Sequence, residues 1–424
     1  MTHRTLTGRC LLGPCSLIAV ASSLWTEPLR GQEGGLTLQQ CVSVALDQNP
    51  LILSARERYQ ASLARVSQAW AFPQPSLDLD SDLQPRLGDF GGSQESYLGV
   101  SGSIPFPVKT YLRGRIAGKE SSEALTDVAI AELEIAYQVK ATFYGLLLAG
   151  ELVTYARQNL ELSRDFVEKT ELKFGAGDVP RVEVIRARVE AARAATRLRR
   201  AENEESLTRA RMNFLLARPG SAALEISGQL KAPPVTYGLE QLTTLALSAR
   251  PEIERIESSL QRASLTKRLG YMSYLPDFEL GAARHRQSGA EDAWQVTLSV
   301  ELPLFFWQPA IGEIREANSN SQALEQEASH LSNLISLEVE EAHRGYTTAV
   351  AQIELMEDEI LSQAEEVYEM YLFSYQQGEI GGIELIEAQR TLSEAREAYA
   401  NSLYDYDVAI AALEKSIGRT LEEN

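Results

Sequence analysis

Cysteine is scarce in this chain of 424 residues, which contains only three. Cys10 and Cys15 lie in a leader-like segment at the start, so Cys41 would stand alone in the mature protein. A lone cysteine cannot form an internal disulfide. The four histidines are scattered without the helical spacing of metal ligands, so we expect no metal site and no cofactor.

Long apolar runs are also missing after the start of the chain, which excludes a transmembrane helix there. If the protein crosses a membrane, we therefore expect it to do so as a closed β-barrel. Positive charge is in deficit, because 40 Lys and Arg stand against 59 Asp and Glu, and this balance argues against nucleic acid as a partner. No nucleophile elbow, metalloprotease motif or phosphate-binding loop is present, so we do not expect an enzyme.

Residues 1–21 are predicted to form a secretory signal peptide. Arg4 and Arg9 supply its positive region, a short apolar run follows, and Ala19-Val20-Ala21 provides a small-residue cleavage site. Lipidation of Cys15 stays open as an alternative to simple cleavage after Ala21, although the preceding Leu12-Gly13-Pro14 matches a lipidation site poorly.

The main positive feature is an internal repeat at an offset of 201 residues. The offset relates Pro50 to Pro251, Pro75 to Pro276 and Gly177 to Gly378. It also relates residues 182–187 to residues 383–388. A repeat of this length is a structural half rather than one turn of a solenoid, whose repeats run roughly 20–50 residues. We predict two halves, residues 22–238 and 239–424.

Each half is predicted to contain one hairpin of two strands. The strands cover about 76–83 and 97–105 in the first half, and about 277–284 and 293–303 in the second. The clearest strand alternates apolar Trp294, Val296 and Leu298 with polar residues, which is typical of a strand with one apolar and one wet face. Small closed barrels need about eight strands, so four strands from one chain would have to combine with those of other chains.

A long segment without proline follows each hairpin, over residues 108–174 and 310–375. The first would measure about 100 Å as a helix at a rise of 1.5 Å per residue. In the second, apolar residues step by four and three, which predicts lateral packing as in a coiled coil. These residues are Ala342, Tyr346, Ala349, Ile353, Met356 and Ile360. Helices of this length cannot fold into a compact globule, so we expect a tube or a rod.

A glycine-containing turn ends each long helix, at residues 174–180 and 375–382. Gly177 and Gly378 are predicted to adopt the left-handed conformation that caps a helix, and Pro180 suits the first position of the returning helix.

The order of helix, hairpin, long helix, glycine turn and helix, repeated twice, resembles the TolC family of outer-membrane efflux channels. The resemblance runs from about Leu36 to Gly418 and includes Tyr274-Leu275-Pro276-Asp277 and Leu302-Pro303-Leu304-Phe305. The latter phrase and the short length are similar to the branch that accompanies heavy-metal and small-drug pumps.

The resemblance implies a mainly α fold with transmembrane β structure: an internally duplicated, long-helix α-barrel plus four strands per chain that contribute to a 12-stranded trimeric β-barrel. The barrel would lie in the lipid of the cell outer membrane, with the helical part in the periplasm. The implied function is the passive exit duct of a tripartite efflux system, for small molecules or metal cations. Its implied partners are two further copies, a periplasmic adaptor protein and an inner-membrane pump, whose contacts would gate the periplasmic tip.

The resemblance also assigns roles to residues of the second glycine turn and its surroundings. Glu384 and Glu387 match the pore constriction, and because they are three apart they share one helical face. Three copies would give rings of carboxylates that favour cations; the alternative is that both are solvated surface residues. Tyr375 and Glu183 match positions that can hydrogen-bond between neighbouring helices and hold the closed state.

At Ile380 the chain departs from the family pattern, which can place an arginine there. We therefore do not expect that salt bridge, and we expect Gly381 and Gly382 to make the turn more pliable. The resemblance assigns adaptor docking to the tip residues Phe174, Gly177, Asp178, Val179, Pro180, Gly378, Glu379, Ile380, Gly381 and Gly382.

Two other functions remain open at this level. One is the outer-membrane duct of a type I protein-secretion system, which would use the same fold. The other is a periplasmic coiled-coil structural protein that does not enter a membrane. The resemblance implies that selectivity resides mainly in the pump, so the sequence does not name the exported compound.

Overall fold

A computed structural model describes residues 35–82, 95–230, 234–287, 289–300 and 309–421. The predicted signal peptide at residues 1–21, with Cys15, lies outside the described residues. So do residues 301–303 at the end of the last predicted strand and the phrase Leu302–Phe305.

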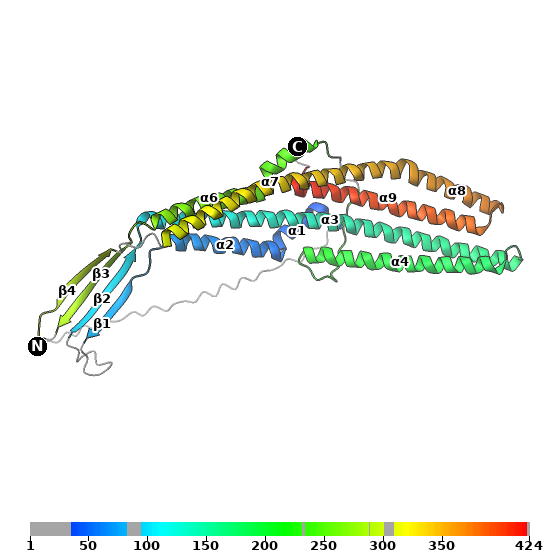
Figure 1. Ribbon diagram of the computed structural model, residues 1–424. Coiled ribbons are helices and arrows are strands. Elements are labelled where there is room, and N and C mark those ends of the chain that lie inside the picture. The colour runs from blue at the N-terminus through cyan, green and yellow to red at the C-terminus, as the bar shows by residue number, and fades with distance from the viewer. Residues whose placement is uncertain (1–34, 83–94, 231–233, 288, 301–308, 422–424) are drawn as a thin grey trace, which may run out of the picture.

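The molecule is long and narrow. The sheet lies at one end, and the turns that connect α3 to α4 and α8 to α9 lie at the other (Figure 1). In chain order, the described elements are α1 (Leu38–Gln48), α2 (Pro50–Trp70), β1 (Ser76–Asp82), β2 (Glu95–Ile104), α3 (Pro107–Ala176), α4 (Arg181–Leu215), α5 (Leu239–Ala249), α6 (Pro251–Met272), β3 (Phe278–Gln287), β4 (Ala293–Val300), α7 (Pro309–Leu355), η1 (Met356–Leu361), α8 (Ser362–Gln377) and α9 (Gly382–Ile417).

The element order repeats as the sequence predicted. The series α1, α2, β1, β2, α3, α4 returns as α5, α6, β3, β4, then α7 to α8, then α9. Helices α1 and α5 begin 201 residues apart, at Leu38 and Leu239. The division of the chain at residues 238 and 239 stays a prediction.

The four strands form one antiparallel sheet in the order β1-β2-β3-β4, so β1 and β4 are its edges. Pairing aligns Leu77 with Val100, Val100 with Ala282, and Ala282 with Val296, which places these apolar residues on one face. The apolar face is uncovered, and Val296 is 78% exposed. The opposite face carries Asp78, Asp80 and Thr297 together with small residues.

The first long helix is unbroken, since α3 runs for 70 residues through all of its glycines. The second is not, because the π-helix η1 separates α7 from α8. Tyr346, Ala349 and Ile353 are buried as the heptad-like spacing predicted, whereas Ile360, inside η1, is exposed. The predicted heptad-like stripe therefore ends at this point, because a π-turn shifts the later side chains out of it.

Two apolar cores lie midway along the helices. One joins α1, α2, α3 and α4, and its members include Ala45, Ile52, Phe143 and Met212. The other joins α5, α7 and α9 through residues such as Leu242, Ile335 and Leu413. Lys109 links the helices to the sheet, because its Nζ lies 2.9 Å from Asp277 Oδ1 just before β3.

Asn49 caps α2 and also fastens it to α4. Its Oδ1 accepts the Leu51 N–H at 2.9 Å, its Nδ2 donates to the Leu215 carbonyl at 3.0 Å, and the residue is only 3% exposed. We predict that Asn49→Ala lowers the stability of the folded chain by about 1–3 kcal/mol, because a cap and a buried hydrogen bond are lost together.

The measurement is the thermal midpoint of the protein in detergent. Asn401→Ala is the control, because that exposed amide bonds only a carbonyl of its own helix. Equal midpoints for the two variants would contradict the role given to Asn49.

Candidate functional site

The end of the molecule opposite the sheet is built from two helical hairpins, α3–α4 and α8–α9 (Figure 1). Gly177 and Gly378 are both left-handed, with φ of 88° and 78°. In each turn the glycine N–H bonds back three residues, to Phe174 or Tyr375, and the next N–H bonds back five, to Lys173 or Ser374. This pattern is a Schellman motif, and it confirms the predicted glycine caps.

Pro180 differs by one position from the prediction. Helix α4 begins at Arg181, and Pro180 is the N-cap residue with extended backbone rather than the first helical residue. Its carbonyl accepts the Glu183 N–H at 3.0 Å.

Four buried residues, which we call the tip cluster, hold the two hairpins together. They are Phe166 on α3, Ala187 on α4, Tyr375 on α8 and Leu385 on α9. The rings of Phe166 and Tyr375 lie 5.6 Å apart between centroids, and Lys173 Nζ lies 4.1 Å from the centre of the Tyr375 ring. The two hairpins are therefore joined at the tip by the contact between the Phe166 and Tyr375 rings, and the Lys173 ammonium group packs on the Tyr375 ring.

Gly382, the first residue of α9, is part of this packing. It is buried, and a Cβ atom at this position would approach Phe166 Cζ to 2.6 Å. The sequence suggested that Gly381 and Gly382 provide pliability. The structure gives Gly382 a steric role as well, because only glycine leaves room for the Phe166 ring.

Tyr375 and Glu183 belong to different hairpins. Tyr375 is 8% exposed within the tip cluster, and Glu183 is half-buried in the first turn of α4. The hydrogen bonds found among the described residues of this single chain do not join the two side chains. Their role in holding a closed state stays a prediction.

Glu384 and Glu387 are both exposed on α9, on the same side of the helix. A carboxylate oxygen of Glu387 lies 3.4 Å from Arg390 Nη1, and Arg390 also lies 3.7 Å from Glu190 on α4. Glu387 is thus partly neutralised by a neighbour that the sequence did not single out, although the spacing of three residues was visible. The role of Glu384 and Glu387 as the pore constriction stays a prediction.

Most residues predicted to dock an adaptor do face solvent. Val179 and Ile380 are half-buried and Gly382 is buried, whereas the others are exposed: Phe174, Gly177, Asp178, Pro180, Gly378, Glu379 and Gly381. The turns therefore present mainly backbone and short side chains to a partner.

Among the described residues, no helix is both long enough and apolar enough to cross a membrane. Within the same residues, no group of three or more His, Cys, Asp or Glu side chains is arranged to hold a metal ion.

Comparison with known proteins shows the family. The sequence matches the family of outer membrane efflux proteins over residues 41–218 and again over residues 242–419. The chain belongs to this family, and each of its two halves carries one of the two matches.

The individual relatives are consistent in fold and length. The chain is 23% identical to the cobalt-zinc-cadmium resistance protein CzcC of Cupriavidus metallidurans over 92% of both chains. It superposes on the outer-membrane channel CmeC of Campylobacter jejuni with a TM-score of 0.75 at 17% identity, covering 91% of this chain and 87% of that one. The open state of the channel MtrE of Neisseria gonorrhoeae gives 0.75 at 15% identity, covering 91% and 90%.

These findings confirm the predicted class and location. The protein is an outer-membrane efflux channel whose helices lie in the periplasm, rather than a protein-secretion duct or a periplasmic coiled-coil protein outside the membrane. CmeC and MtrE are both outer-membrane channels.

We predict that Gly382→Ala loosens the tip. The added methyl group meets Phe166, and overpacking of this kind costs about 1–3 kcal/mol, more than the helix propensity gained. The expected result is faster limited proteolysis near residues 174–182 and 375–385 in the purified protein.

Gly345→Ala is the matched control, because a Cβ atom on that helical glycine would meet nothing beyond its own helix within 4 Å, so the position should tolerate the change. Adding Phe166→Leu to Gly382→Ala should restore resistance. Equal proteolysis of all three variants would contradict the steric role.

Proposed function

We propose that three copies of this chain form one exit duct of a tripartite efflux system, whose inner-membrane pump supplies the energy. A periplasmic adaptor protein would dock on the exposed turns around Gly177 and Gly378. The duct itself would be passive, and its tip would open when partner contacts repack the hairpins.

The observation that carries the proposal is the uncovered sheet. Its apolar face has no covering layer among the described residues, and its edge strands β1 and β4 have no partners there. Lipid would cover the apolar face, and neighbouring copies would pair with the edges. Three copies of four strands would supply twelve, above the roughly eight that a small closed barrel needs.

The polar face of the sheet supports the same arrangement. Asp78 and Asp80 lie beside Gly99 and Tyr97 across the β1–β2 pair, on the side opposite Leu77 and Leu79. In a closed barrel this face would line a water-filled bore, where carboxylates remain solvated.

Metal cations are the substrate class that we favour, with small molecules as the second candidate. CzcC, one relative, is named for resistance to cobalt, zinc and cadmium. Glu384 and Glu387 would present rings of carboxylates at the constriction in a threefold assembly, which suits cations.

The closed state would depend on contacts at the tip. Tyr375 is already held by Phe166 and Lys173 within one chain. We propose that Tyr375 and Glu183 hydrogen-bond between neighbouring helices when the duct is closed, and that partner contacts release this bond.

Val296→Arg tests the membrane-facing surface. An arginine at the lipid-facing midplane of a barrel costs about 2–4 kcal/mol, so we predict a large loss of folded protein from the outer-membrane fraction. Thr297→Arg, one residue on and on the polar face, is the control and should insert normally. Equal amounts of both variants in that fraction would contradict the assignment of the two faces.

Replacing both Glu384 and Glu387 with glutamine tests the constriction. We predict a clear fall in the cation-over-anion permeability ratio of single channels in planar bilayers, because fixed negative charge is removed from the narrowest part. Glu240→Gln on α5 removes an exposed carboxylate away from the tip and should leave the ratio unchanged. An unaltered ratio in the double variant would refute the assignment.

A further inference from the structure

The face of α4 that points away from its own chain carries an apolar stripe. Val184, Ala187 and Ala194 are buried against the rest of the chain. On the opposite side, Val182, Ile185 and Val189 are exposed, with Ile185 at 51%. The spacing of three and four residues is that of a coiled-coil seam.

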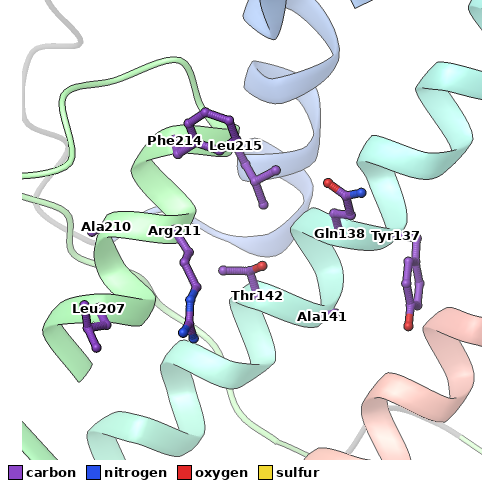
Figure 2. A pocket seen from close by; sticks show the side chains of 9 residues that line it. All are labelled: Tyr137, Gln138, Ala141, Thr142, Leu207, Ala210, Arg211, Phe214 and Leu215. Carbon is purple, nitrogen blue, oxygen red and sulfur yellow. The ribbon is translucent and has the colours of Figure 1, made fainter. Parts of the chain in front are cut away.

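The apolar stripe continues to the C-terminal end of α4, which is the end far from the tip. Leu207 and Phe214 lie on the same side of the helix and are also exposed, and Figure 2 shows them on one wall of a shallow hollow whose other wall is α3. Tyr137 and Thr142 come from α3. A side chain of a neighbouring helix could seat in such a hollow.

Helix α8 carries a second uncovered stripe. Its Ala364 packs on Leu392 and Ala395 of α9. Its other side exposes Met370 and Phe373, the latter at 62%. Helices α4 and α8 lie on opposite sides of α3 and α9 (Figure 1), so one chain cannot bring the two stripes together.

The two stripes are flanked by opposite charges. Residues 181–200 contain seven arginines and two glutamates. Residues 345–389 contain ten Asp and Glu and no Lys or Arg. In a chain with an overall excess of acid, an arginine-rich helix and a long segment without any cation are the two extremes of charge.

Several of these charges have no counter-ion within the part of the chain that the structure describes. Arg199 and Arg200 on α4 are exposed, as are Glu359, Glu366 and Glu369 on η1 and α8. None of the five forms an ion pair with another described residue. Arg193 pairs with Glu190 on its own helix, at 3.4 Å.

The charges also lie at matching levels. Ala187 and Leu385 meet in the tip cluster. Helix α8 ends at Gln377 and α9 begins at Gly382, so Leu385, three residues into α9, is level with about residue 374, and Ala187 is level with that residue too. Since α4 runs away from the tip and α8 toward it, Val189, Arg193 and Arg200 are level with about residues 372, 368 and 361. Met370, Glu366 and Glu359 lie within two residues of these levels, about 3 Å at a helical rise.

We propose that the arginine-bearing face of α4 in one copy packs on the carboxylate-bearing face of η1 and α8 in the next copy. Val189 meets Met370 in the seam, and Arg193 and Arg200 pair with Glu366 and Glu359. This rests on the proposed assembly of several copies, and it names the surfaces that join them and the force that selects them. A rotation about an axis along the helices keeps the levels in register.

Such a seam is head-to-tail, so it closes only as a ring. Each copy offers one basic and one acidic edge, and like edges repel. The paired charges are exposed at the rim of the seam, so their attraction weakens as salt screens it.

Cysteine cross-linking tests the seam directly. We expect Val189→Cys combined with Met370→Cys, in a Cys41→Ala background, to give covalent dimers and trimers on oxidation of the purified protein in detergent. Cysteines can bridge only when their Cα atoms lie within about 7 Å. The native Cys41 is buried, and burial raises the pKa of its thiol to about 11, so its removal is a precaution.

The mismatched pair Val189→Cys with Ile360→Cys is the control. Ile360 lies ten residues before Met370 in the chain, about 15 Å further from the tip at a helical rise, so this pair should not cross-link. Each single-cysteine variant should also stay monomeric on a denaturing gel.

Charge reversal tests whether attraction between the arginines and the carboxylates selects this seam. Arg200→Glu alone should lower the temperature at which the assembly dissociates by several degrees in low salt, and the difference should shrink in about 1 M salt. Adding Glu359→Arg should restore most of the loss, because the pair is re-formed with its signs exchanged.

The outcomes separate this inference from the assembly itself. One outcome is that light scattering shows the Val189→Cys, Met370→Cys protein to be a trimer while that pair gives no cross-link. That result overturns the seam and leaves the trimer standing, and so does equal cross-linking of the matched and mismatched pairs. A monomer by light scattering overturns both. Failure of Glu359→Arg to rescue Arg200→Glu overturns the charge pairing even where Val189 and Met370 cross-link.

Discussion

The whole structure depends on apolar surface that one chain cannot cover. The sheet ends in two unpaired edges and exposes Val296 and its neighbours, and α4 and α8 expose apolar stripes on opposite sides of the helical part that the structure describes. Burial of such surface is the main favourable term in folding and association. In the proposed assembly, each chain is therefore one segment of the wall of the duct. Lipid and further copies would complete what the segment leaves open, and the same requirement applies at both ends of the molecule.

The duplication supplies two hairpins of nearly the same design, but they are not equivalent. The α3–α4 hairpin grows from one unbroken helix, whereas the long helix of the second half changes pitch at η1 before reaching α8. The two are joined at the tip by Phe166 and Tyr375, in a contact that needs glycine at residue 382. The α8–α9 hairpin thus has the π-helix η1 at the end far from the tip and the Phe166–Tyr375 contact near the tip. This arrangement suits a hairpin that moves when the duct opens. Opening would then exchange one packing at the tip for another.

The sequence predicted the order of elements, the four strands and the two glycine caps, because each follows from local patterns. Alternation marks Trp294 to Leu298, and glycine marks the left-handed turns at Gly177 and Gly378. It did not predict η1, since Met356 and Ile360 keep the heptad spacing and only packing against α9 reveals the break. It also missed Phe166 and Arg390, whose roles come from contacts between hairpins far apart in the chain. Glu384 and Glu387 were proposed from resemblance alone, and a single chain leaves their position relative to a pore axis undefined.

The central claim is that several copies of this chain build one duct, and the mass of the purified protein in detergent tests it most directly. Light scattering corrected for bound detergent should give three times the mass of the mature chain, in particles that aggregate when detergent is withdrawn. A stable monomer that remains dispersed without detergent would contradict the account, because its sheet and helix stripes would then need no partner at all.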